Sequence, residues 1–519
     1  STYFLLFLYF ITHIIMASET QTQRLRVFFL PYCTAGHMIP LVDTARVFAQ
    51  NGVDVTIVTT AANAVIFQKP IDGDANAGNR IRVHVLQFPS AQVGLPDGVE
   101  NFQSATSMEM GGLVHTGFKL LRDPMERLFR EARPDCLVTD MFFPWTADVA
   151  AELGIPRIIF RVSSYFERCV NHSLRLHEPH KLTDSYVVSI PGLPHRVELL
   201  RSQISDWIQK RDDEFALLMD SVRDSEPKSY GAIFNSFREL EGPYEDHYRN
   251  VVGMKSWSVG PIFLWDRVKI ERYNFAGGRG VREEQGMILS WLSSKQRNSV
   301  LYMGFGTLTR FHETQLAEMA HGLESSGHPF IWVVWKNDNE GADQAQTALP
   351  NGFEERMRET QKGLVIKGWA PQKLILDHPS VGGMVTQCGW NSVLEGLTAG
   401  VPMMTWPLFA EQFNNERLLT DVLGVGVSVG VKQWRLYNFG EERKEEVVKR
   451  EQIAEAVAEL MGGGEEAEER RKRVKTLAHE AKKALESEGS SRANLASLIN
   501  ELKAWKSGKS TSGYNNQAI

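Results

Sequence analysis

The stretch RVFFLPYCTAGHMIPLVDTARVFAQNGVDVTIVTT, residues 26–60, decides the fold class. It contains an apolar strand, a Gly-bearing loop, an amphipathic helix that ends at a glycine, and a second strand rich in Val, Ile and Thr. The strand residues are apolar without alternation, which is typical of a parallel sheet covered by helices on both faces. The stretch therefore predicts a βαβ unit of a doubly wound α/β domain.

The same rhythm recurs along the chain. Apolar runs at 134–142, 155–163 and 230–237 read as further strands, and a polar, Gly-rich stretch at 265–286 then interrupts the pattern. After this candidate linker the pattern restarts, with strands predicted at 298–307, 329–335, 363–370, 382–386 and 401–407. We expect two Rossmann-like domains that face each other across a cleft, without a sequence repeat between them.

These patterns give expected domain boundaries. The N-terminal domain spans 16–253 and the C-terminal domain 254–480, with the linker at about 265–286. A C-terminal helix at 481–507 is expected to pack back on the N-terminal domain, and 508–519 form a disordered tail.

Composition excludes several classes of protein. Hydrophobic residues make up 43% of the 519-residue chain and charged residues 23%, which is typical of a globular protein. The net charge of −6 argues against a nucleic-acid partner, which would favour a basic domain. The four cysteines lack metal-ligand spacing, so we expect free thiols in a reduced, cytoplasmic protein.

The first 15 residues, STYFLLFLYFITHII, are strongly apolar and precede Met16. They lack the basic region and the cleavage site of a signal peptide, and the run is short for a membrane span. We interpret 1–15 as upstream or non-native sequence, and we expect no stable membrane insertion.

A second stretch, GGMVTQCGWNSVLEGLTAGVP (382–402), indicates a strand, a corner and a helix. Asn391 and Ser392 fall at the start of this helix, where side chains and free backbone N–H groups can hold an anion. Ordinary capping of a crossover helix would account for the same residues. The corner alone therefore leaves both an anion site and a capped helix open.

Other polar and aromatic residues follow neighbouring strands. Trp369 and Gln372 lie just past one predicted strand, and Glu411 and Gln412 just past another. Ligands of open α/β sheets bind beyond the carboxyl ends of strands, so we expect these groups to converge. A Trp can stack on a base, Glu395 can accept hydrogen bonds from ribose, and an acid–amide pair can bind sugar hydroxyls. A nucleotide sugar would use all of them.

Residues 369–412 closely resemble the 44-residue signature of plant family-1 glycosyltransferases, which use uridine diphosphate sugars. The matching letters are WAPQ, CGWNS, Glu395, GVP, WP and AEQ. GHMIPLVDTARVFA, VTDMFFPWTADVA and GSSRANLASLINEL are similar to the subgroup that acts on triterpenoid, steroid and flavonoid acceptors. The stretch at 91–102, AQVGLPDGVENF, is similar to legume-type saponin glycosyltransferases.

The resemblance implies a GT-B fold with an acceptor-binding N-terminal domain and a UDP-sugar-binding C-terminal domain. It implies no cofactor, with a UDP-sugar, UDP-glucose above all, as co-substrate. The sugar is expected on a hydroxyl or carboxyl of a small hydrophobic plant metabolite. We expect a monomer. The implied donor contacts are uracil for Trp369 and Gln372, ribose for Glu395, diphosphate for Thr307, Asn391 and Ser392, and the sugar for Trp390, Glu411 and Gln412. In this family a terminal glutamine accompanies glucose, so Gln412 favours glucose over galactose, with xylose and glucuronic acid left open.

His37 and Asp140 are the candidate catalytic residues. Both lie on loops at the carboxyl ends of predicted strands, although a loop imidazole bonded to backbone and a helix N-cap are simpler interpretations. The resemblance implies a dyad in which His37 removes a proton from the acceptor hydroxyl and Asp140 fixes the tautomer of the His37 imidazole. The oxygen then displaces the diphosphate with inversion. No acidic metal-binding cluster is evident, so we expect metal-independent transfer.

Gln387 departs from the family pattern, which has histidine there as a donor to the diphosphate. Because a neutral amide forms weaker bonds than a charged donor, we expect a weakened enzyme, by roughly ten- to a hundredfold. Gly304 is a second departure, since serine is common at that position.

The predicted acceptor is a triterpenoid or saponin, and a flavonoid or other phenol is the alternative. Residues 102–118, 141–145 and 163–170 are candidate lining for an apolar acceptor pocket. A donor-binding protein with weak or no catalysis is a third interpretation because of Gln387. An NAD-dependent oxidoreductase is disfavoured, since GFGTLT lacks the third glycine of the dinucleotide fingerprint.

Overall fold

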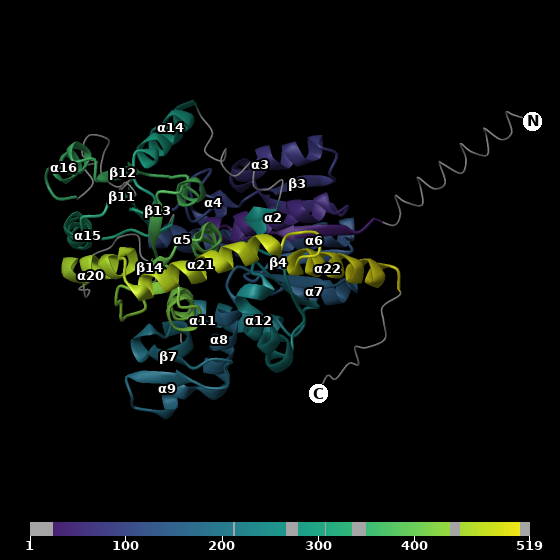
Figure 1. The fold of residues 1–519 in the computed structure, drawn as a ribbon. Coiled ribbons are helices and arrows are strands. Elements are labelled where there is room, and N and C mark those ends of the chain that lie inside the picture. The colour runs from purple at the N-terminus through teal and green to yellow at the C-terminus, as the bar shows by residue number, and fades with distance from the viewer. Residues whose placement is uncertain are drawn as a thin grey trace, which may run out of the picture.

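The computed structural model describes residues 24–210, 213–265, 279–306, 308–334, 349–435 and 447–508. The predicted leader, Thr307 and all but the first residue of the predicted tail lie outside these ranges. The described part has the predicted fold class: two parallel sheets with helices on both faces (Figure 1).

The N-terminal domain is built on a seven-stranded sheet within the described residues. Every pair of neighbouring strands is parallel. The spatial order is β3 (Ile81–Leu86), β2 (Asp54–Thr60), β1 (Arg26–Leu30), β4 (Cys136–Asp140), β5 (Arg157–Arg161), β8 (Gly231–Phe234) and β9 (Ser256–Ser258). A small antiparallel pair, β6 (Val187–Ile190) with β7 (Val197–Leu200), lies outside this sheet.

The C-terminal domain repeats the architecture with six parallel strands among the described residues. Their order is β12 (Gly363–Lys367), β11 (Phe330–Val334), β10 (Val300–Gly304), β13 (Val381–Thr386), β14 (Met403–Thr405) and β15 (Gly426–Ser428). In both sheets the direction of winding reverses after the third strand, which is the Rossmann arrangement.

Helices connect the strands and cover both faces (Figure 1). Those of the N-terminal domain are α2 (Ala35–Gln50), α3 (Ala61–Asn76), α4 (Ser90–Val93), α5 (Met108–Leu120), α6 (Arg122–Ala132), α7 (Thr146–Leu153), α8 (Tyr165–His177), α9 (Pro179–Leu182), α10 (Asp206–Gln209), α11 (Glu214–Ser225) and α12 (Arg238–His247). Those of the C-terminal domain are α14 (Arg279–Ser293), α15 (Glu313–Ser326), α16 (Phe353–Glu359), α17 (Gln372–Leu376), α18 (Trp390–Ala399) and α19 (Gln412–Arg417).

Strand β1 shows why these runs are continuously apolar. Val27 and Phe29 pack in a cluster with side chains of α2, whereas Phe28 and Leu30 pack in another with side chains of α5 and α6. Both faces of the strand are therefore buried from Val27 to Leu30, so these positions do not alternate between apolar and polar residues as in a half-exposed strand.

The C-terminal helices return the chain to the N-terminal domain. Helices α20 (Arg450–Met461), α21 (Glu465–Lys483) and α22 (Ser490–Lys506) run in yellow from one domain to the other (Figure 1). Leu495 and Leu498 of α22 are buried in the same cluster as β1 and α2. Ser491 donates from Oγ to the carbonyl of Gly260 over 2.6 Å. The last helix thus completes the core of the first domain.

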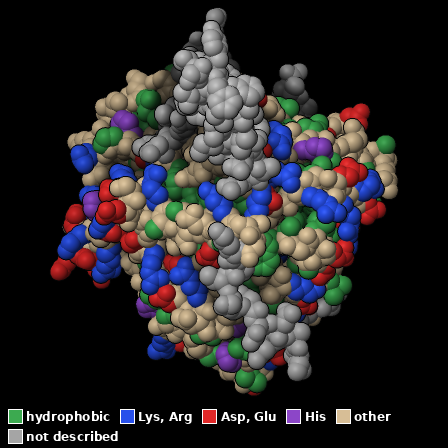
Figure 2. All heavy atoms as spheres, turned by 90° about the vertical axis from the view of Figure 1, so that its right-hand side faces the viewer, with side chains coloured by type: hydrophobic (Ala, Val, Ile, Leu, Met, Phe, Trp, Pro, Cys, Tyr) green, Lys and Arg blue, Asp and Glu red, His purple; other side chains and the backbone are tan. Residues whose placement is uncertain are grey.

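Part of the predicted linker at 265–286 lies outside the described residues, and the part from Arg279 onward belongs to helix α14. No helix of the described residues is long and apolar enough to cross a membrane. Acidic and basic side chains are interspersed on the face that Figure 2 shows, in keeping with the small net charge.

The packing of α22 predicts that Leu498→Ala destabilises the N-terminal domain. Leu498 is fully buried, so its truncation leaves a cavity and costs about 2–5 kcal/mol. Thermal unfolding should show a Tm lower by several degrees, whereas Asn500→Ala, at an exposed position of the same helix, should leave the Tm unchanged. Equal Tm values for the two variants would contradict this packing.

Candidate functional site

The predicted site residues gather where the strand order of each sheet reverses. In the N-terminal sheet this point lies between β1 and β4, with Leu30 opposite Thr139. In the C-terminal sheet it lies between β10 and β13, with Gly304 opposite Thr386. Loops that leave neighbouring strands diverge to opposite faces at such a point, which leaves backbone groups open to a ligand.

His37 and Asp140 meet at the N-terminal reversal point. His37 lies in the first turn of α2 and Asp140 ends β4, and Nδ1 of His37 is 2.8 Å from Oδ2 of Asp140. The backbone N–H of Phe142 donates to the other carboxylate oxygen over 2.9 Å. Asp140 caps no helix, since α7 begins at Thr146. A carboxylate only accepts, so Nδ1 carries the proton and Nε2 is left with a lone pair.

The electrostatics of His37 favour proton uptake. Burial by itself lowers the pKa of His37, but the carboxylate of Asp140 outweighs it and the net pKa is raised above 6.5. Asp140 is fully buried, whereas 19% of the His37 side chain is exposed. The pair is therefore a strong proton acceptor with access from outside.

Aromatic rings surround His37. The ring of Phe142 stacks on it at a centroid distance of 5.2 Å and an angle of 20°, and Tyr32 meets it edge-on at 6.0 Å. The hydroxyl of Tyr32 is hydrogen-bonded to Nδ1 of His115 over 2.6 Å. Phe215 of α11, which is 40% exposed, lies 6.4 Å from Phe142 between centroids. An apolar molecule would find flat rings beside the imidazole.

The C-terminal corner combines a strained residue with an open helix end. Cys388 is buried and has a positive φ of 67°, a conformation that costs a non-glycine residue free energy. Helix α18 follows directly, and its N-cap, Gly389, supplies no side chain to bond the first N–H groups. These N–H groups form the positive end of the helix dipole.

Gln387 lies between this corner and the loop after β10. Its Oε1 accepts a hydrogen bond from the hydroxyl of Thr309. Its Nε2 lies against Gly306, where an added Cβ would meet it at 2.7 Å. Gly306 has a positive φ of 68°, which also favours glycine.

Three of the predicted donor residues, Gln372, Ser392 and Glu395, form one connected group. Nε2 of Gln372 lies 3.1 Å from Oγ of Ser392 and 2.9 Å from Oε2 of Glu395, and Trp369, three residues earlier in the chain, is 39% exposed. The hydroxyl of Tyr302 donates to Oε1 of Gln372 over 3.1 Å. The same tyrosine accounts for the second departure from the family pattern, because a Cβ at Gly304 would meet its hydroxyl at 2.7 Å.

Two predicted donor residues make contacts between the domains. Nδ2 of Asn391 donates to the carbonyl of Gly36, next to His37, over 2.8 Å. The indole N–H of Trp390 donates to the carbonyl of Asn235 over 2.8 Å, and the ring is buried. Both side chains are thus engaged with the N-terminal domain.

Glu411 and Gln412 differ in their freedom to bind a ligand. Gln412 is buried, and its Oε1 accepts from the backbone N–H groups of Leu408 and Phe409 over 2.9 and 3.0 Å. Glu411 is half-buried, and burial raises its pKa to about 7, against hydrogen bonds from backbone N–H groups that include that of Trp390. His37 also interacts electrostatically with Glu411, so the acid of the C-terminal domain faces the base of the N-terminal domain.

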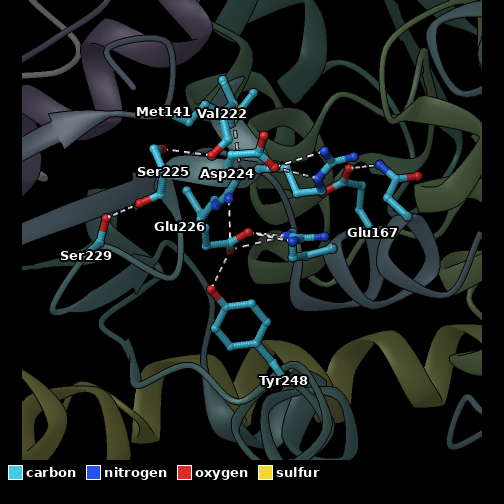
Figure 3. Close-up of polar contacts among 12 residues, drawn as sticks. Met141, Glu167, Val222, Asp224, Ser225, Glu226, Ser229 and Tyr248 are labelled. Carbon is cyan, nitrogen blue, oxygen red and sulfur yellow. Dashed lines mark hydrogen bonds and ion pairs between the residues drawn. The ribbon is translucent and has the colours of Figure 1, made fainter. Parts of the chain in front are cut away.

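A buried ionic cluster supports the N-terminal side of the site (Figure 3). Glu226 binds Arg168 through both oxygens at 3.1 and 3.0 Å, and it accepts from the hydroxyl of Tyr248 over 2.7 Å. Nη2 of Arg161 lies 2.8 Å from the same carboxylate, and its Nη1 is 3.4 Å from the sulfur of Met141, the residue after Asp140. Burial by itself raises the pKa of Glu226, but the two arginines hold it well below its usual range. The cluster joins β5, α8 and the end of α11, and Arg161 connects it to Met141 beside Asp140.

Sequence reasoning missed several of these partners. Thr309, Tyr32 and Asn235 each make a contact to a residue distant in the chain, and no spacing rule points to them. Phe142 lies within the predicted pocket lining at 141–145, but its stacking on His37 was not expected. Within the described ranges, no group of three or more His, Cys, Asp or Glu side chains has the arrangement of a metal site.

The chain is similar to known sugar transferases. The family profile described as "UDP-glucoronosyl and UDP-glucosyl transferase" matches residues 282–454. A soyasapogenol B glucuronide galactosyltransferase of Glycine max is 48% identical, over 95% of this chain and 98% of its own. A nuatigenin 3-beta-glucosyltransferase of Solanum aculeatissimum is 44% identical, over 94% and 99%.

A solved structure matches the whole architecture. Glycyrrhiza uralensis UGT73P12, complexed with glycyrrhetinic acid 3-O-monoglucuronide, superposes with a TM-score of 0.86. The two chains are 47% identical, and the match covers 94% of this chain and 97% of the other. The arrangement of two Rossmann-like domains is therefore that of a GT-B glycosyltransferase.

The contact between His37 and Asp140 predicts a measurable titration. NMR of labelled histidines should give His37 a pKa above 6.5, because the carboxylate stabilises the imidazolium. Asp140→Asn should lower this pKa, since burial remains and the charge is gone. Asp148→Asn, which removes an exposed carboxylate of α7, should have no effect. An unchanged pKa in Asp140→Asn would contradict the electrostatic account.

Proposed function

Since the chain belongs to the UDP-glucoronosyl and UDP-glucosyl transferase family and is a UDP-glycosyltransferase, we propose that it transfers glucose from UDP-glucose to a hydroxyl of a triterpenoid saponin. The observation that supports this most is the single connected site. The His37–Asp140 pair and the N-terminus of α18 are joined through the hydrogen bond from Asn391 to Gly36.

The donor would lie along the carboxyl ends of β12, β13 and β14. Trp369 offers an exposed ring to uracil, and Gln372 holds the carboxylate of Glu395 in place for the ribose hydroxyls. Ser392 and the first N–H groups of α18 would bind the diphosphate, because the helix dipole favours an anion there. Thr307, outside the described residues, keeps its proposed place beside the diphosphate.

The sugar would lie between the domains, next to Glu411. Its half-buried carboxylate can accept hydrogen bonds from sugar hydroxyls, and Gln412 retains Nε2 as a donor once its oxygen caps the loop. Trp390, whose backbone N–H is hydrogen-bonded to Glu411, is the third residue that we propose at the sugar. This set of neutral and acidic groups supports a neutral hexose, and glucose is the sugar we propose.

Catalysis would begin at Nε2 of His37. This nitrogen takes the proton of the acceptor hydroxyl while Asp140 stabilises the imidazolium that forms. The acceptor oxygen then forms a bond to the anomeric carbon as the bond to the diphosphate breaks, which inverts the anomeric configuration. The preorganised N–H groups at α18 receive the charge that develops on the leaving diphosphate.

The acceptor class is proposed from the rings and from the relatives. Phe142, Tyr32 and Phe215 offer an apolar wall beside the imidazole, which suits a polycyclic hydrocarbon skeleton. The Glycine max relative is named for a triterpenoid glucuronide, and the Glycyrrhiza uralensis structure contains one. We therefore propose a triterpenoid monoglucuronide as the preferred acceptor, with the new bond on its sugar. The buried free cysteines are in keeping with a proposed cytoplasmic, monomeric enzyme.

The test is an assay of the protein with UDP-glucose, UDP-galactose and UDP-glucuronic acid against a panel of acceptors, followed by mass spectrometry. We expect glucosides of glycyrrhetinic acid 3-O-monoglucuronide to form fastest, ahead of the free aglycone and of flavonols. His37→Ala should reduce kcat by about a hundredfold or more, because the general base is lost. Flavonol glucosides alone would favour the phenolic alternative, and UDP binding without product would favour a donor-binding protein.

Replacement of Gln387 by histidine is predicted to make the enzyme more efficient with its donor. Gln387→His should raise kcat/KM for the donor by roughly ten- to a hundredfold, because a cationic donor binds the diphosphate more strongly than an amide does. The control is Gln361→His, at an exposed position before β12. An unchanged kcat/KM for Gln387→His would refute the hypothesis that the neutral amide weakens binding of the diphosphate.

A further inference from the structure

We propose that Thr309 is a positioning residue that turns the amide nitrogen of Gln387 toward the diphosphate of the donor. This inference rests on the proposed function, since it assigns a role within the same donor site. It concerns a residue that the sequence motifs leave out.

The contact between Thr309 and Gln387 joins the two loops at the C-terminal reversal point. The hydroxyl of Thr309 donates to Oε1 of Gln387, and Thr309 is 6% exposed. Thr309 follows β10, and Gln387 follows β13, its neighbour in the sheet. The sheet pairing therefore places the hydroxyl and the amide side by side.

The other end of the amide faces two glycines. An added Cβ at Gly306 would meet Nε2 of Gln387 at 2.7 Å, and one at Gly389 would meet it at 3.6 Å. Gly389 is the N-cap of α18 and supplies no side chain to bond the first N–H groups of that helix. The Nε2 group thus adds a further donor beside the backbone donors proposed to bind the diphosphate.

The orientation of an amide matters more than that of an imidazolium. A glutamine has one donor end and one acceptor end, and the acceptor end would repel a phosphate oxygen. With Nε2 toward the diphosphate, Oε1 points to a buried place and needs a donor of its own, which the Thr309 hydroxyl supplies. Without that hydroxyl the productive orientation leaves a buried acceptor unsatisfied.

The experiment measures the Kd of UDP and of uridine by calorimetry for the parent protein, Thr309→Val and Thr309→Ser. Thr309→Val keeps the shape of the side chain and should raise the Kd of UDP by about five- to tenfold. This is the loss expected for a buried acceptor without its donor. Uridine has no phosphate, so its Kd should stay the same. Thr309→Ser keeps the hydroxyl and should bind UDP as the parent does.

A double-mutant cycle separates positioning from packing. In a Gln387→Leu background the amide is absent, so adding Thr309→Val should not raise the Kd of UDP any further. An equal loss of UDP affinity with and without the amide, or an equal loss for UDP and uridine, would overturn the proposal. If the parent protein itself fails to bind UDP, the proposed function falls, whereas parent binding that Thr309→Val leaves unchanged overturns this inference alone.

Discussion

Two hydrogen bonds from the first turn of α18 join the domains where their strands end. The indole of Trp390 donates to Asn235, and the amide of Asn391 donates to Gly36. Asn235 directly follows β8, and Gly36 lies in the first turn of α2 beside His37. The N-terminus of α18 is thereby fixed against the first turn of α2, which carries the imidazole of His37. A shift of this contact would separate the proposed base from the proposed donor site.

The chemistry we propose depends on what surrounds that contact. Asp140 is fully buried and uses both oxygens, one on His37 and one on the backbone of Phe142. The raised pKa of Glu411, about 7, places a second proton-accepting group nearby in the C-terminal domain. Because burial weakens the competition from water, each of these interactions is stronger than it would be at the surface. The buried cluster around Glu226 keeps the supporting elements in place (Figure 3).

The sequence predicted most of the fold, because both domains follow one rule. Apolar runs without alternation marked β1, β4, β5, β10 and β13, and the Rossmann fold class is confirmed. Edge elements such as β3 and β15 were missed. In β3 the burial is interrupted by exposed and half-buried positions, and β15 has three residues, so neither gives a strong periodic signal.

The site was predicted only in part, for a physical reason. His37, Asp140, Gln372 and Glu395 could be named because the chain resembles a family whose motifs include them, and the strand-end rule added that such groups gather at one edge of each sheet. Other contacts around the site could not be predicted. Thr309 meets Gln387, Asn235 meets Trp390 and His115 meets Tyr32 through side-chain geometry that no periodicity records. Asn391 and Gln412 differ most from what the sequence predicts. The amide nitrogen of Asn391 donates to the carbonyl of Gly36, and the amide oxygen of Gln412 accepts from the backbone, so neither group is left open for a ligand.

The central claim is that His37 and the proposed diphosphate site at the N-terminus of α18 face one point between the domains. A crystal structure of the protein with UDP and a triterpenoid monoglucuronide tests it most directly. The account predicts a sugar hydroxyl of the acceptor about 2.6–3.2 Å from Nε2 of His37, with the diphosphate at the N-terminus of α18 and at Nε2 of Gln387. An acceptor hydroxyl held away from His37, or a diphosphate bound elsewhere than at α18, would contradict it.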